Sequence, residues 1–411
     1  MKFRYLLILL LLISTITTSQ NKEVKSKIDV EKVEQDFESL LNNIKNYYPY
    51  LNEDVVDLSC IKAYYSKQIQ NLKTIQEVVL FFEFVIMEFY DNHFTLNTSN
   101  NKSYRLSAPI YLSLKKNKVF VENVWTSNIQ NLETNILKAE VLSFNGVDFS
   151  KAIEDFPTQC ADKSNPKVRK WIANKIIYGT YNQPRILQLK LTDGSIFSLD
   201  VDKIVLKNTT SLLTTKILDN IGVITINNSL GDNKLISAFD KVLDSLSDTK
   251  AIILDFRNTV SGGNTYVAKG IMSRFINQEK PYQKHSLFES YNNQPKIKRS
   301  FVEYVTPRGK QYKKPLIVLA GRWTGSMGEG LTIGLDGLQR ATIIGTEMRK
   351  LKGAVYTVPF KNFNFAYNMP AEKLFHINGT PREKFIPKNY INQNNVDADA
   401  FLEKALIILK K

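Results

Sequence analysis

Cysteine and histidine are scarce in this chain of 411 residues, which contains two cysteines and three histidines. The sequence has no His-Glu-x-x-His or Cys-x-x-Cys spacing, and no Gly-x-x-x-x-Gly-Lys-Ser/Thr loop, so the common zinc and nucleotide-phosphate motifs are absent. We therefore expect neither a metal nor a cofactor. Two cysteines as far apart as Cys60 and Cys160 predict no disulfide framework, and we expect two unpaired, mostly structural thiols.

Long apolar runs are also lacking, except at the N-terminus. Lys2 and Arg4 precede the run Leu6–Ile13, and small polar residues follow through Ser19. This pattern is typical of a secretory signal peptide over residues 1–19. The run is shorter than the roughly 20 residues that span a bilayer. We expect an exported protein, periplasmic or extracellular, with no integral membrane segment after signal removal.

Basic residues outnumber acidic ones, 55 to 40, for a net charge of +15. They are scattered along the chain without an aromatic-interleaved motif, so no nucleic-acid partner is predicted. A solvated basic surface that faces an anionic envelope or acidic substrates is the plainer interpretation.

The hydrophobic pattern divides the chain into three regions. Residues 29–100 repeat apolar side chains at helical spacing and predict an N-terminal helical domain. Residues 103–207 contain short alternating segments and predict a β-rich region. Residues 212–411 alternate strands and helices, which predicts an α/β core with largely parallel strands.

The segment Gly325-Ser326-Met327-Gly328-Glu329-Gly330 follows the apolar run Pro315–Ala320 and opens a predicted helix over Met327–Leu338. A buried strand that feeds a tight turn and then a helix holds a hydroxyl rigidly, near N–H groups that favour negative charge. That position suits the nucleophile of an acyl-transfer enzyme. The alternative is a strand-to-helix turn in which serine is only an N-cap.

Four separated blocks resemble the tail-specific (C-terminal-processing) serine protease family, which includes the tricorn core protease. They are Ala251–Arg257 with its preceding strand, Asn258–Asn264, Pro315–Gly345 and Asn378–Glu383. The resemblance implies a Clp-protease/crotonase-like α/β core behind the N-terminal helical domain. It also implies a PDZ-like middle region, chiefly through Ala139–Gly146, that recognises an extended peptide by strand addition. An unrelated β-rich insert is the alternative for this region.

The family uses either a serine served by histidine and glutamate, or a serine paired with lysine. Asp91-Asn-His-Phe-Thr95 resembles the histidine segment, and Glu383 occupies the position that resembles the glutamate. The resemblance thus implies Ser326 as nucleophile, His93 as general base and Glu383 as the residue that orients it. Lys352, before Gly353, is the rival base. Of the other histidines, His285 lies in a basic stretch that predicts a loop, and His376 precedes Asn378-Gly379.

Acyl transfer also needs N–H donors for the developing oxyanion. The amide of Met327 is one candidate, and that of Gly262 or Gly263 is the other. Glycines there allow the backbone to approach a substrate closely.

These observations predict an exported serine endopeptidase that acts on peptides or unfolded proteins. The rivals are the same fold with a Ser326–Lys352 dyad and a non-catalytic peptide- or ligand-binding member, because one fold can serve several functions. The sequence specifies neither the cleavage preference nor the oligomeric state.

Overall fold

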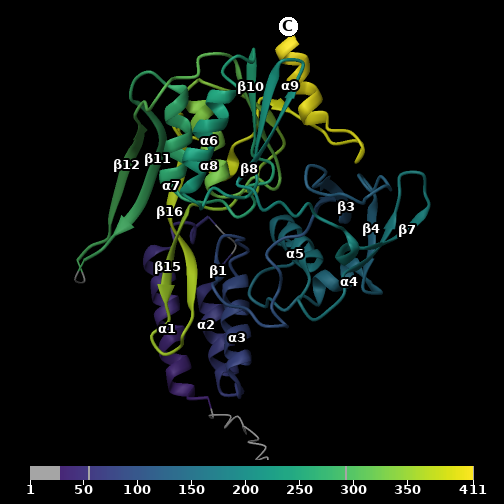
Figure 1. Ribbon diagram of the computed structural model, residues 1–411. Helices are drawn as coiled ribbons and strands as arrows, with labels where there is room; N and C mark the ends of the chain where they lie inside the picture. Colours follow the sequence, from purple (N-terminus) through teal and green to yellow (C-terminus); the bar gives the residue numbers. More distant parts are fainter. Residues whose placement is uncertain (1–27, 54–55, 292–293, 411) are drawn as a thin grey trace, which may run out of the picture.

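The computed structural model describes residues 28–53, 56–291 and 294–410. The predicted signal peptide, residues 1–19, lies outside these residues. The described chain is a mixed α/β structure in which a helical region and a β-rich region both lie below a larger α/β region in the view of Figure 1.

Three helices pack side by side in the N-terminal region (Figure 1): α1 Val30–Tyr47, α2 Leu58–Ile69 and α3 Ile75–Met87. Helix α3 begins with a capping box, because Glu77 N–H donates to Thr74 Oγ1 (3.2 Å) and Thr74 N–H donates to the Glu77 carboxylate (3.1 Å). The chain then reaches the short strand β1, Thr95–Leu96, which pairs with β16, Ala366–His376. The turn between α3 and β1 contains His93.

The middle region holds an antiparallel sheet in the order β2-β3-β4-β6-β7, with β5 paired to β4. Asn145 and Gly146 both have positive φ and form the predicted turn between β4 and β5. Helices α4 and α5 were not predicted, although Asn165 and Pro166 at the start of α5 are a readable N-cap and first-turn proline. The elements are β2 Ile110–Lys115, β3 Lys118–Val124, β4 Glu140–Phe144, β5 Val147–Asp148, α4 Phe149–Glu154, α5 Pro166–Tyr178, β6 Ile186–Lys190 and β7 Ile196–Asp200.

The C-terminal region is built on a six-stranded sheet in the order β17-β14-β13-β10-β9-β8. All its pairs are parallel except β8 with β9. Ile252 and Leu254 of β10 belong to the core shared with α6, α7 and α8, whereas Ile253 packs with α9. Successive side chains therefore reach opposite faces, and both faces are covered by helices. The elements are β8 Leu213–Leu218, β9 Ile221–Ile226, α6 Lys234–Ser245, β10 Ala251–Asp255, α7 Thr265–Met272, β13 Leu316–Ala320, α8 Met327–Gly337, β14 Thr342–Gly345, β17 Asn389–Tyr390 and α9 Ala400–Lys410.

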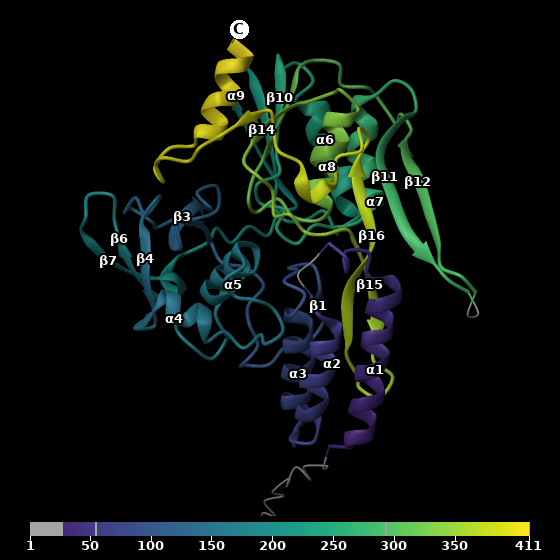
Figure 2. The ribbon, with the colours of Figure 1, turned by 180° about the vertical axis from the view of Figure 1, so that it is seen from behind.

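A third sheet joins β16 to β1, β11 and β15, with β12 paired to β11. Its other strands are β11 Lys280–Glu289, β12 Ile297–Val305 and β15 Ala354–Pro359. The β11–β12 hairpin extends away from the body of the molecule (Figure 2). The predicted loop around His285 is wrong, since this residue is buried on β11 and its Nδ1 contacts Glu372. Charged residues such as Lys284, Lys298 and Arg299 interrupt the apolar pattern of this hairpin and concealed its strands.

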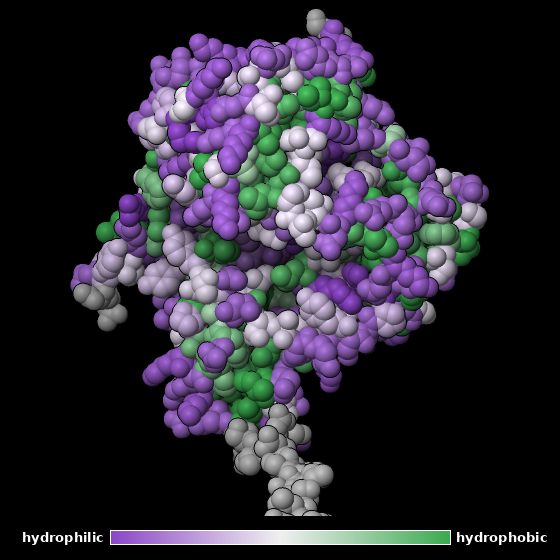
Figure 3. Space-filling model, in the orientation of Figure 1, coloured by the Kyte–Doolittle hydropathy of each residue, from purple (hydrophilic) through white to green (hydrophobic). Residues whose placement is uncertain are grey.

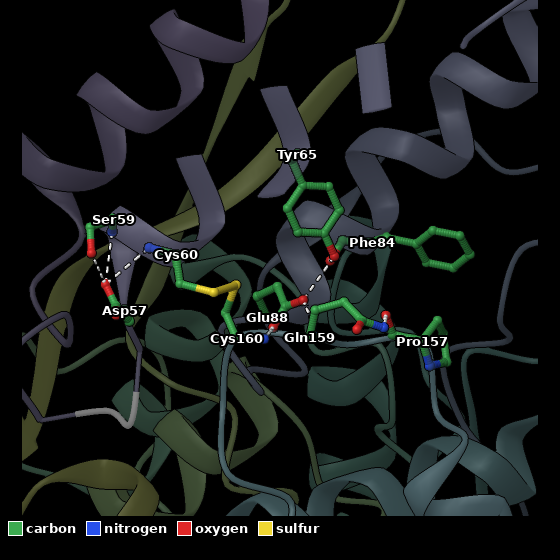
Figure 4. The surroundings of a disulfide bond; sticks show 9 residues. All are labelled: Asp57, Ser59, Cys60, Tyr65, Phe84, Glu88, Pro157, Gln159 and Cys160. Carbon is green, nitrogen blue, oxygen red and sulfur yellow. Dashed lines mark hydrogen bonds between the residues drawn. A yellow bond between two sulfur atoms is a disulfide. The ribbon is translucent and has the colours of Figure 1, made fainter. Parts of the chain in front are cut away.

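Cys60 and Cys160 form a disulfide, so the prediction of two unpaired thiols is wrong. Figure 4 shows the bond between α2 and the segment that precedes α5. Next to it, Glu88 accepts hydrogen bonds from the backbone N–H groups of Gln159 (2.6 Å) and Cys160 (3.1 Å). The pair is 100 residues apart in sequence, and only the packing of the helical region against the middle region brings it together.

Replacing both cysteines with alanine should lower the free energy of unfolding by about 2–4 kcal/mol, because the bond closes a long loop in the unfolded chain. Urea unfolding of the oxidised protein and of the double variant measures the difference. Dithiothreitol should shift the wild type toward the variant and leave the variant unchanged. Equal urea midpoints for all three samples would contradict a stabilising role.

Hydrophilic residues cover most of the face shown in Figure 3, and apolar residues occur there in small groups. Within the described ranges, no helix is both long enough and apolar enough to cross a bilayer.

Candidate functional site

Ser326 lies where strand β13 gives way to helix α8. Every residue of β13 is buried, and α8 begins at Met327, so Ser326 is held at the helix N-terminus. Its backbone has φ 48° and ψ −109°. This conformation is sparsely populated by residues other than glycine and costs on the order of 1–3 kcal/mol. The surrounding structure must therefore hold Ser326 in place.

The side chain of Glu329 helps to keep Ser326 in this backbone conformation. Its side chain is fully buried, and its Oε2 accepts a hydrogen bond from Ser326 N–H at 2.9 Å. The same carboxylate accepts from the N–H groups of Lys350 (2.9 Å) and Leu351 (3.2 Å). Burial raises the pKa of Glu329 to about 7, against the opposing effects of Arg382 and the three N–H donors. Glu329 was not predicted from the sequence, although Ser326 and Glu329 have capping-box spacing.

His93 is fixed from two sides. The backbone N–H of His93 donates to Asp91 Oδ1 (2.9 Å), and the ring Nδ1 lies 2.7 Å from the carbonyl oxygen of Lys352. A carbonyl can only accept, so Nδ1 carries the proton and Nε2 keeps its lone pair. Burial, followed by the charge of Arg382, lowers the pKa of His93 to about 3. The imidazole is therefore neutral at physiological pH, the form a general base requires.

The side chain of Lys352 lies among aromatic rings. Its Nζ is 3.4 Å from Tyr48 Oη and 5.3 Å from the centroid of the Tyr50 ring. Tyr48 Oη also contacts Asp91 Oδ2 at 3.1 Å. The rival base thus contacts His93 through its backbone carbonyl, a role that no sequence motif could have indicated.

Glu383 forms no hydrogen bond with His93 or Ser326 in the described ranges. Within the part of the chain that the structure describes, no side-chain hydrogen bond joins His93 to Ser326 or to Glu383, and Glu383 Oε2 is buried without a partner. Burial raises the pKa of Glu383. The neighbouring Arg382 donates to the carbonyls of Leu351 (3.0 Å) and Gly353 (2.7 Å). This segment therefore supports the loop that carries the Lys352 carbonyl.

The loop at Gly262 and Gly263 lies against Ser326. A Cβ added to Gly262 would be 2.4 Å from Ser326 Cβ and 3.0 Å from Met327 N, so no other residue fits there without displacement. Gly262 N–H already donates to Thr259 O at 3.0 Å. Among the described residues, no hydrogen bond engages the N–H groups of Met327 and Gly263. Of the three oxyanion candidates, Met327 and Gly263 therefore have a backbone N–H that can donate to an oxyanion.

The other two histidines form separate contacts. His285 Nδ1 contacts Glu372, and His376 Nε2 lies 3.1 Å from Asp336 Oδ2. In the described ranges, no group of three or more histidine, cysteine, aspartate or glutamate residues has the arrangement of a metal site.

Residues 220–390 match the family model of Peptidase family S41. The match includes Ser326, Lys352 and Glu383, whereas His93 precedes it. No curated protein matches the sequence.

Solved structures share the fold along most of the chain. Mature CPAF complexed with lactacystin is 12% identical, with a TM-score of 0.59, over 93% of this chain and 97% of that one. A putative peptidase from Parabacteroides merdae is 14% identical, with a TM-score of 0.55, over 92% and 97%. The photosystem II D1 C-terminal processing protease is 11% identical, with a TM-score of 0.54, also over 92% and 97%. At such identities these likenesses show the fold alone, and the family match supports a serine-type peptidase.

Proposed function

We propose that this chain is an exported serine endopeptidase that hydrolyses peptide bonds through an acyl-enzyme at Ser326. The observation that carries the proposal is the strained backbone of Ser326, held by Glu329 at the start of α8. Strain of this kind persists where the surroundings enforce it, and it is found at nucleophiles on strand-to-helix turns.

His93 acts as the general base in this proposal. Its Nε2 takes the Ser326 proton as Oγ bonds to the substrate carbonyl carbon, and the amides of Met327 and Gly263 stabilise the oxyanion. The imidazolium then protonates the leaving nitrogen as the C–N bond breaks. Water attacks the ester, His93 accepts its proton, and Ser326 regains its hydrogen as the acid departs. Catalytic hydrogen bonds are often long before substrate binds, so we expect His93 and Ser326 to approach each other in the complex.

The orienting role is assigned to the Lys352 carbonyl, which fixes the tautomer of His93. Glu383 as the orienting acid stays a prediction. We place the chain with the histidine-dependent, tricorn-like branch, whereas a Ser326–Lys352 dyad remains the rival. We also propose a Clp-protease/crotonase-like core, a PDZ-like middle region and export to the periplasm or the extracellular space.

A non-catalytic peptide-binding protein is the second candidate. It is favoured by the missing hydrogen bond between His93 and Ser326 and by the engaged N–H of Gly262.

Cleavage of unfolded protein and peptide mixtures separates the two candidates. The Ser326→Ala variant should lose at least about 10³-fold in the rate of hydrolysis relative to the wild type. Ser245→Ala, at an exposed site on α6, is the matched control and should cleave normally. Equal cleavage by Ser326→Ala and the control would exclude the proposed nucleophile.

A further inference from the structure

Two tryptophan side chains are stacked where the middle region meets the core. Trp125 directly follows β3, and Trp323 lies between the end of β13 and Ser326. The ring centroids are 5.4 Å apart with an interplanar angle of 1°, and the two residues are only 6% and 7% exposed. Figures 1 and 2 show β3 on the side of the middle region that lies next to the core. This stack therefore belongs to the junction between the two regions.

Each indole N–H of the stack donates a hydrogen bond across the junction. Trp323 Nε1 donates to Ala108 O (2.9 Å), just before β2 of the middle region. Trp125 Nε1 lies 3.0 Å from Arg257 O and 2.9 Å from Asn258 Oδ1, so its single proton is shared between these two acceptors of the core. A buried indole N–H normally has a partner, and here each partner belongs to the opposite region.

Asn258 receives two hydrogen bonds from the middle region. Ser127 Oγ donates to Asn258 Oδ1 at 2.8 Å, beside the bond from Trp125. Asn258 begins the segment 258–263, which we call the oxyanion loop because it ends at Gly263, one of the two proposed oxyanion donors. The middle region thus holds the first residue of a loop whose last residue faces the substrate in the proposed mechanism.

The oxyanion loop is held a second time through Arg349. Its Nη1 donates to Val260 O (2.8 Å), and its Nη2 donates to Leu106 O (2.6 Å), in the segment before β2. Both guanidinium bonds end on backbone carbonyls, so Arg349 joins the loop to the middle region independently of Asn258.

The same loop is bonded to the turn that carries Ser326. Gly325 N–H donates to Thr259 O at 3.2 Å, and Gly262 N–H donates to the same carbonyl at 3.0 Å. A shift of the loop at Thr259 therefore displaces both the glycine segment and the residue before the nucleophile. Displacements of about 1 Å in such a site are enough to lower a rate by about 10²-fold.

We propose that Trp125 is a positioning residue for the oxyanion loop. Its N–H, together with the hydroxyl of Ser127, holds Asn258 so that the Gly263 amide is aimed at the oxygen that becomes the oxyanion. Trp323 keeps the ring of Trp125 in place through the stack. An oxyanion donor is effective only when it is aimed before the reaction starts. The inference rests on the proposed peptidase function and gives the middle region a part in the chemical step.

The variant Trp125→Phe, compared with Trp171→Phe, tests the role of this N–H. Trp125→Phe keeps an aromatic ring in the stack but leaves Arg257 O and Asn258 Oδ1 without the indole donor. Trp171 is the third tryptophan, and its Nε1 is buried without a partner, so Trp171→Phe removes an N–H that holds nothing. Hydrogen exchange of the segment 257–264, measured by mass spectrometry, should be about tenfold faster in Trp125→Phe than in the wild type and unchanged in Trp171→Phe.

Steady-state kinetics on a fluorogenic peptide separates positioning from a merely structural role. In Trp125→Phe, kcat should fall about tenfold while KM stays within about twofold, because the loop acts on the transition state more than on the bound substrate. Trp171→Phe should keep both constants. Circular dichroism checks that each variant is folded.

Ser127→Ala is a smaller change at the same acceptor, and it carries both measurements if Trp125→Phe does not fold. It should speed exchange of the loop and lower kcat by about threefold each, because Asn258 keeps the bond from Trp125. Loop exchange in Trp125→Phe and Ser127→Ala that equals that of Trp171→Phe would overturn the inference, as would faster exchange with an unchanged kcat. If the loop exchange responds as expected but the wild type cleaves no peptide, Trp125 still positions the loop and the peptidase proposal fails. Cleavage by a wild type whose loop is insensitive to both variants removes only the positioning role.

Discussion

Replacing His93 with alanine is expected to lower kcat for peptide hydrolysis by about 10³-fold. The neutral ring has its Nδ1 proton directed at the Lys352 carbonyl, so Nε2 is the available base. Alanine removes that base and leaves Ser326 with a hydroxyl that hardly ionises at neutral pH. Single-turnover kinetics on one fluorogenic peptide would measure the loss in the chemical step.

Lys352→Ala is the decisive companion to this variant. It removes the ammonium but keeps the backbone carbonyl, so kcat should fall by less than about tenfold. Circular dichroism of both variants checks that each is folded. A Lys352→Ala variant that loses activity as fully as Ser326→Ala, with His93→Ala still active, would establish the lysine dyad instead.

Replacing Glu329 with alanine is the second change with a large expected effect. It leaves the N–H groups of Ser326, Lys350 and Leu351 without their acceptor in a buried site, so the free energy of unfolding should fall by about 3–5 kcal/mol. It also frees the strained Ser326 backbone and the loop that orients His93. We therefore expect kcat to fall by about 10²-fold at a temperature where the variant is still folded.

Glu329→Gln and Glu133→Ala serve as controls for this prediction. Glu329→Gln keeps one acceptor oxygen, so its free energy of unfolding and its kcat should lie between those of the wild type and of Glu329→Ala. Glu133 is exposed, so Glu133→Ala should change neither the free energy of unfolding nor kcat.

The pKa of Glu329 in the folded protein, about 7, is above its ordinary value. The part of its stabilisation that is linked to protonation is therefore fully present below the ordinary carboxyl pKa and is lost as pH rises through about 7, whereas the carboxylate still accepts its three N–H hydrogen bonds. Urea titrations should show this pH dependence in wild type and not in Glu329→Gln; unchanged stability in Glu329→Ala would contradict the bridging role.

The parts of the site that depend on local sequence could be predicted. A buried strand, a glycine-flanked serine and a helix-like stretch placed Ser326 and Met327 correctly at the start of α8. The capping-box spacing could also have indicated Glu329, but not that it reaches Lys350 and Leu351, because those contacts depend on tertiary packing.

Other features of the structure were not predicted, either because the sequence carries no signal for them or because neighbouring residues obscure the signal. A backbone carbonyl is present at every residue, so no pattern singles out that of Lys352. The pairing of Cys60 with Cys160 depends on how two regions pack. Helix α5 was missed although Asn165-Pro166 marks its start, since Arg169, Asn174 and Lys175 are buried polar residues that interrupt its apolar pattern.

Labelling of the folded wild-type protein with a fluorophosphonate probe tests the central claim most directly, because the probe bonds covalently to an activated serine. Peptide mapping by mass spectrometry should find the adduct on Ser326, and the Ser326→Ala protein should remain unlabelled. A folded wild-type protein that cleaves no peptide and forms no adduct at Ser326 would contradict the account.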